Sequence, residues 1–130
     1  MRARPFCVPL LAGAVFLLLL NGAARPAQAA DPAAGQAVFR QQCGICHSPK
    51  AGRNMIGPSL FGVVGRKTGS VPGYTYSVAN KNSNITWTPE VLDKYLDSPQ
   101  SVIPGTKMPY GGLKDPIKRA NLIAYLETLK

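Results

Sequence analysis

The longest apolar run of the chain lies near its N-terminus, between Val8 and Leu20, and two arginines within the first four residues precede it. The small-residue sequence Ala27-Gln28-Ala29 follows the run. A helix over these 13 residues spans about 20 Å, whereas a bilayer core is about 30 Å thick. The pattern therefore predicts a cleaved secretory signal over residues 1–29 and an exported domain over residues 30–130, without stable membrane insertion.

Apolar and polar positions are compatible with helices in three segments of the predicted domain. These segments are Pro32 to about His47, Pro89 to Asp97 and Pro116 to Leu129. Each begins with proline, which suits the first helical position, and each follows a residue able to cap it: Asp31, Thr88 and Asp115. Gly35 costs stability inside the first helix, so it is either a site of close backbone approach or a tolerated surface glycine.

Glycine and proline are frequent between the predicted helices, most densely from Gly52 to Gly112. Such composition predicts long irregular loops. A domain of about 100 residues with few periodic elements has a small core of its own. We therefore expect a cofactor to help fill its centre.

Basic residues outnumber acidic ones, and the net charge of the whole sequence is +9. Removal of residues 1–29 would lower it to +6, because Arg2, Arg4 and Arg25 would be lost. Positive charge alone would suit nucleic acid or acidic proteins as partners. Predicted export and the absence of a basic and aromatic groove motif argue against nucleic acid.

The cysteines carry the clearest chemical signal. Cys7 falls in the predicted signal, and a disulfide between Cys43 and Cys46 would close a tiny, strained loop. The sequence Cys43-Gly44-Ile45-Cys46-His47 instead has the Cys-x-x-Cys-His spacing of c-type haem attachment. Helical positions i, i+3 and i+4 share one face, so both thiols can meet the vinyl groups of one porphyrin while His47 faces its iron.

Two other uses of the cysteine pair fit less well. A thioredoxin-like redox pair needs a strand before the motif, whereas the preceding segment has a helical pattern. A closed zinc site needs four ligands, and the predicted domain holds two cysteines and one histidine. We therefore expect one covalent haem c with His47 as an iron ligand.

The second axial ligand of the iron is open to several candidates: Met55, Met108, a lysine or water. Met55 is eight residues from His47, which is enough chain to reach the opposite side of a porphyrin. Met108 ends the segment Val102 to Met108, whose prolines and glycine favour an extended strap. Either methionine could instead fill the core.

The early Cys-x-x-Cys-His and the late Pro104-Gly105-Thr106-Lys107-Met108 together resemble class I cytochrome c. Further segments extend the resemblance to bacterial cytochromes c2 and the mitochondrial protein over about Gly35 to Leu129. They are Gly57–Leu60, Gly65–Gly69, Pro72–Tyr76, Ala79–Asn82, Ile85–Trp87 and Leu122–Leu126. The resemblance implies an all-α class I cytochrome c fold, with three main helices and long loops around one covalent haem, and Met108 as the sixth ligand.

The same resemblance implies further roles around the haem. The carbonyl of Pro58 should bind the free ring nitrogen of His47. The haem propionates should be bound by Arg66, Tyr76 and Trp87, and the polar cluster near the Met108 sulfur should consist of Asn80, Tyr95 and Thr106. From the residues alone, Trp87 and Tyr95 could also be core aromatics, and Arg66 a solvated loop charge.

The resemblance implies a soluble, monomeric one-electron carrier of the periplasm, not an enzyme. It would pass electrons from a bc1-type complex to a photosynthetic reaction centre or a terminal oxidase, docking through a basic haem-edge surface. Lysines frequent at that edge are thinned, since Gln42, Gln100 and Ser101 stand at such positions. The alternatives are a membrane-tethered subunit that retains residues 1–29 and a ligand-binding or peroxidatic haem protein.

Overall fold

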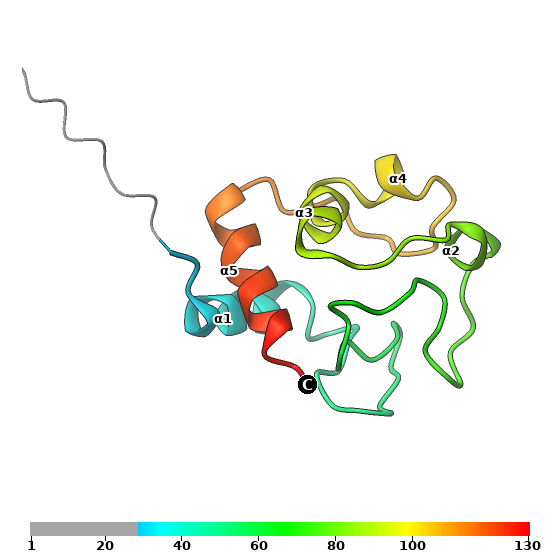
Figure 1. Ribbon diagram of the computed structural model, residues 1–130, viewed down its shortest axis with the longest axis horizontal. Helices are drawn as coiled ribbons and strands as arrows, with labels where there is room; N and C mark the ends of the chain where they lie inside the picture. The colour runs from blue at the N-terminus through cyan, green and yellow to red at the C-terminus, as the bar shows by residue number, and fades with distance from the viewer. Residues whose placement is uncertain (1–28) are drawn as a thin grey trace, which may run out of the picture.

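The computed structural model describes residues 29–130 as helices joined by long loops (Figure 1). The helices are α1 (Pro32–Gln42), α2 (Val78–Asn82), α3 (Pro89–Asp97), α4 (Pro99–Val102) and α5 (Pro116–Glu127). In this part of the chain, extended pairing is limited to one antiparallel bridge between Lys67 and Thr86. The prediction of an all-α fold is confirmed.

The predicted signal over residues 1–29 lies, except for its last residue, outside the described residues, so its cleavage stays a prediction. Within residues 29–130, no helix is both long enough and apolar enough to span a bilayer.

The predicted starts of three helices are confirmed, together with their caps. The Asp31 carboxylate accepts a hydrogen bond from the Ala33 amide at 2.8 Å, and the Thr88 hydroxyl accepts one from the Val91 amide at 3.3 Å. Asp115 accepts two amide hydrogen bonds at the start of α5. The proline that follows each cap has no amide hydrogen to leave unpaired, so sequence and geometry agree at all three starts.

The predicted end of the first helix was wrong. Helix α1 ends at Gln42 rather than near His47. The amides of Cys46 and His47 both donate to the Cys43 carbonyl, at 3.0 and 2.9 Å, and so form a turn. The haem-attachment motif therefore lies on a tight turn that continues from α1, and not on the helix itself.

The last helix is also shorter than predicted, and two further helices were missed. Helix α5 ends at Glu127, where the Thr128 amide donates to the Tyr125 carbonyl, three residues back, at 3.0 Å. Helices α2 and α4 have five and four residues, which is too short for a helical period to stand out in the sequence.

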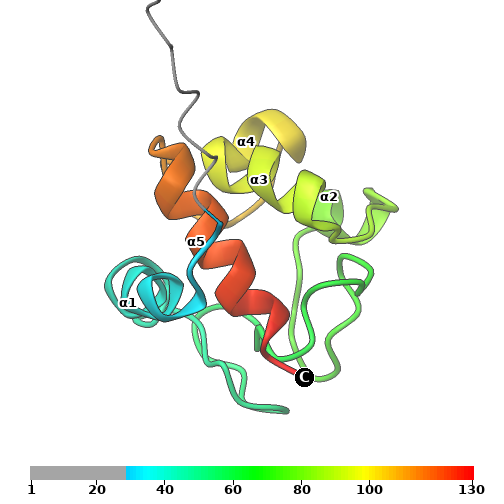
Figure 2. The same ribbon diagram turned by 60° about the vertical axis from the view of Figure 1, so that its left-hand side comes forward.

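Helix α5 lies between α1 and α3, as Figures 1 and 2 show from two directions. At the crossing of α1 and α5, a Cβ added to Gly35 would be 1.9 Å from the carbonyl oxygen of Asn121. The rings of Phe39 and Tyr125 pack beside it with centroids 5.4 Å apart. Gly35 is thus a site of close backbone approach, which was one of its two expected roles.

Gly35→Ala is expected to destabilise the folded protein by about 3 kcal/mol or more, because the new methyl group must push α1 away from α5. Thermal unfolding of the haem-loaded protein measures the loss. The control is Gly111→Ala, because an added Cβ there meets nothing within 4 Å. That variant should stay within about 0.5 kcal/mol of the parent. Equal stability of the two variants would contradict the assigned crossing.

Candidate haem site

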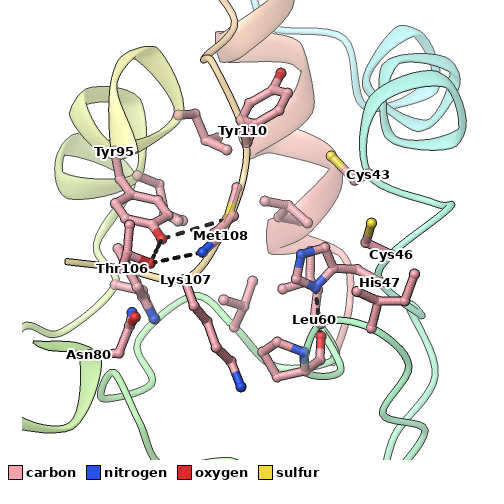
Figure 3. A pocket seen from close by; sticks show the side chains of 18 of the residues that line it. Cys43, Cys46, His47, Leu60, Asn80, Tyr95, Thr106, Lys107, Met108 and Tyr110 are labelled. Carbon is pink, nitrogen blue, oxygen red and sulfur yellow. Dashed lines mark hydrogen bonds between the residues drawn. The ribbon is translucent and has the colours of Figure 1, made fainter. Parts of the chain in front are cut away.

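A cavity of about 550 Å³ lies at the centre of the domain, between the Cys-x-x-Cys-His turn and the strap that carries Met108 (Figure 3). Its size falls within the range of cofactor pockets. The deepest part of the wall is apolar and comes from the loop after the motif, from α3 and from α5: Leu60, Val63, Leu92, Leu96, Leu122 and Leu126. A large apolar group placed here would complete the small protein core.

The motif side chains lie along one side of this cavity. Cys43 and Cys46 are free thiols, and His47 is next to them (Figure 3). Burial, and then the charge of Cys46, raise the pKa of Cys43 to about 11. Reactive redox cysteines have lowered thiol pKa values, so this environment does not suit a thioredoxin-like pair.

The imidazole of His47 is held in a defined orientation. Its Nδ1 lies 2.8 Å from the carbonyl oxygen of Pro58, which can only accept, so Nδ1 carries the proton. Burial lowers the pKa of His47 more than this hydrogen bond raises it. The neutral ring keeps the lone pair of Nε2 free for a metal.

Gly57 also packs closely against the His47 ring. A Cβ at Gly57 would lie 2.2 Å from Cε1 of His47, so no larger residue fits against the imidazole without moving it. This contact was not predicted, because it joins residues that are ten positions apart through the path of a loop. The glycine before Pro58 was the only signal in the sequence.

Met108 lies on the opposite side of the cavity, where polar groups hold it in place (Figure 3). The Tyr95 hydroxyl donates to the Met108 sulfur at 3.6 Å and lies 3.3 Å from the Thr106 hydroxyl. Thr106 also accepts a hydrogen bond from the Met108 amide at 3.4 Å. Asn80, buried in the same wall, accepts a hydrogen bond from the Ser77 hydroxyl at 2.7 Å.

Arg66, Tyr76 and Trp87 also line the cavity. The guanidinium of Arg66 donates to the carbonyls of Phe61 and Ser59, at 2.7 and 2.9 Å, while its buried Nε–H has no partner in the described structure. An unsatisfied buried donor costs about 1–3 kcal/mol. An anionic group inside the cavity would remove this cost, so the donor set fits a ligand that carries carboxylates.

Comparison with known proteins agrees with this geometry. The sequence model of the cytochrome c family matches residues 32–130. The chain belongs to the cytochrome c family. It is 58% identical over 100 residues to cytochrome c2 of Rhodopila globiformis, which covers 77% of this chain and 94% of the relative. It is 48% identical to cytochrome c2 of Blastochloris viridis over 112 residues, or 85% of this chain and 87% of that protein.

A solved structure gives the same result at the level of the fold. Cytochrome cH from Methylobacterium extorquens superposes with a TM-score of 0.71 and 43% sequence identity, over 75% of this chain and 98% of that one. As a cytochrome c, the chain binds one covalent haem c, and the residues present fit this group: two thiols, an imidazole, a thioether, apolar walls and an unpaired guanidinium donor. The predictions of the family, the fold and the cofactor are confirmed.

The two methionines that the sequence leaves as alternative iron ligands lie in different places in this cytochrome c. Met108 lines the haem cavity, whereas Met55 is 41% exposed and lines a separate cavity of about 440 Å³. Among residues 29–130, no group of three or more His, Cys, Asp or Glu side chains is placed to hold a metal ion.

Proposed function

We propose that His47 and Met108 are the two axial ligands of the haem iron and that the protein is a periplasmic one-electron carrier. The observation that supports this is the placement of a lone-pair nitrogen and a thioether sulfur on opposite sides of one apolar cavity (Figure 3). When bound, the haem supplies an iron that alternates between Fe(III) and Fe(II). Thioether ligation favours the reduced state.

The chain's own residues would keep this site rigid. Pro58 fixes the imidazole, and Tyr95 and Thr106 fix the strap of Met108. Arg66, Tyr76 and Trp87 would bind the propionates. Ligands held on both sides leave no coordination position for a substrate, so we assign electron transfer and no enzymatic turnover.

Tyr95→Phe tests the role of the hydroxyl beside the sulfur. The phenyl ring can keep the tilted contact with the Trp87 ring, whose centroid is 4.7 Å away, while the hydrogen bond to Met108 is lost. A donor withdraws electron density from the sulfur and so stabilises Fe(II). Loss of about 1 kcal/mol of that interaction should lower the potential by roughly 40 mV. An unchanged potential in a redox titration would contradict this role.

The proposed setting follows from the predicted export and from the relatives. Both relatives described above are named cytochrome c2. We propose a bc1-type donor and, as acceptor, a reaction centre or a terminal oxidase. The carrier would be a monomer that binds no nucleic acid. Mixing the reduced protein separately with purified reaction centres and with purified oxidase shows which acceptor it uses, because only its physiological acceptor should oxidise it rapidly. Oxidation by neither would contradict the proposal.

Removal of residues 1–29 belongs to the same proposal and has its own test. The mass of the purified haem-loaded protein should correspond to a chain that starts near Ala30. A mass that includes residues 1–29, in a protein that stays with the membrane fraction, would favour the tethered subunit.

A further inference from the structure

The strap that carries Met108 is held by a glutamine side chain on each side of the methionine. Thr106 and Tyr110 stand two residues before and two residues after Met108 (Figure 3). Gln100 forms hydrogen bonds with the strap before Met108, and Gln42 forms one with the strap after it. Both glutamines stand at positions where lysine is frequent in class I cytochromes c, so these contacts give the departure from lysine a structural meaning.

Gln100, the second residue of α4, uses both ends of its side-chain amide. Its Nε2 donates to the Thr106 carbonyl at 2.9 Å, and its Oε1 accepts a hydrogen bond from the Gly105 amide at 3.3 Å. One planar group thus binds the donor of one strap residue and the acceptor of the next. Lysine carries only donors, so it could not accept from the Gly105 amide. The first half of the strap is therefore fixed to α4.

Gln42 fixes the second half of the strap to the side of the cavity that carries the thiols. It is the last residue of α1 and directly precedes Cys43. Its Oε1 accepts a hydrogen bond from the Tyr110 hydroxyl at 3.3 Å, and Gln42 and Tyr110 both line the haem cavity. This bond joins the strap to the residue before the haem-attachment turn.

The glutamine contacts leave only a short segment of the strap between them: Lys107, Met108 and Pro109. The proline ring fixes one backbone dihedral of this segment, and the Lys107 ammonium donates to the Thr75 carbonyl. A displacement of the strap away from the cavity must therefore break at least one of these contacts.

We propose that Gln42 and Gln100 are positioning residues for the sixth iron ligand. They hold the strap so that the Met108 thioether stays over the haem and the iron stays closed to small exogenous ligands. This inference rests on the proposed ligation of the iron by Met108. Both glutamines are exposed, so water competes for their amide groups and each contact contributes modestly. Because they act on the same short segment, their effects on its opening should combine.

The test is the binding of imidazole to the oxidised holoprotein, followed by its absorption spectrum. At high imidazole concentration, the observed rate reaches a limit set by how fast the thioether leaves the iron. Gln100→Met and Gln42→Met keep the length of the side chain but remove its hydrogen bonds, and each should raise the limiting rate by about threefold or more. The double variant should raise it by about tenfold or more.

The matched control is Gln36→Met, the same substitution at an exposed position of α1. The Gln36 side chain accepts a hydrogen bond from Arg40 at 2.7 Å, within the helix and away from the strap. Its limiting rate should equal that of the parent. If Gln36→Met raises the rate as much as Gln100→Met does, a general loss of stability is the cause and the proposal is wrong. Parental rates in both strap variants would overturn it as well.

Met108→Ala separates this inference from the proposed function. It should bind imidazole rapidly and without a limiting rate, because no thioether has to leave. If the parent and Met108→Ala bind imidazole alike, the proposed ligation by Met108 fails. If Met108→Ala is faster than the parent while both glutamine variants match the parent, the ligation stands and the positioning role of the glutamines alone fails.

Discussion

Replacing Cys43 and Cys46 together with alanine is expected to abolish covalent haem attachment completely. Both thiols lie on one turn at the edge of the cavity and are free to react with one porphyrin. In cells competent in cytochrome c maturation, the parent should keep its haem stain on a denaturing gel, and the double variant should give a colourless band.

The matched control is Cys7→Ala, the third cysteine of the sequence, which falls in the predicted signal. It should leave the stained band at its parental strength. A colourless parent band, with the protein present in normal amount, would contradict covalent attachment. Staining that survives the double substitution would assign the attachment to other residues.

Met108→Ala is expected to lower the midpoint potential by about 180 mV. This value follows if the thioether binds Fe(II) about 1000-fold more tightly, relative to Fe(III), than the water or lysine that replaces it, at about 59 mV per tenfold. The same change should open a coordination position to small exogenous ligands such as azide. Redox titration and ligand-binding spectra would show both effects. The variant would then behave as a ligand-binding haem protein.

Met55→Ala is the control for this substitution. Met55 is exposed and lines the second cavity, so its removal should change neither the potential nor ligand binding. If Met55→Ala lowered the potential while Met108→Ala left it unchanged, the axial methionine would have been assigned to the wrong residue.

Local sequence signals predicted the parts of the fold that depend on neighbouring residues. The starts of α1, α3 and α5 are set by a capping side chain followed by proline, and both act within one helical turn. The end of α1 depends on how the Cys43 carbonyl is shared by two amides in a turn. A helical pattern of residues that continues past Gln42 does not reveal that two amides share this one carbonyl.

In the haem site, too, the features that depend on neighbouring residues could be predicted from the sequence, and those that depend on long-range packing could not. The spacing of Cys43, Cys46 and His47 is local, so the sequence sufficed to predict their chemistry. The sequence alone left Met55 and Met108 as alternatives, because chain length allows both to reach the iron, and only the packing of the loops separates them. The contact of Gly57 with His47 needed the three-dimensional path of a loop.

The most direct test of the proposed iron coordination is the NMR spectrum of the reduced protein with 13C-labelled methionine methyl groups. After signal removal, the chain holds two methionines, Met55 and Met108. A methyl group bound over the haem lies in the ring current of the porphyrin. We predict one methyl resonance far outside the ordinary methionine range, absent in Met108→Ala and retained in Met55→Ala. Two ordinary methyl resonances, or a displaced one that survives Met108→Ala, would contradict His47 and Met108 as the ligand pair.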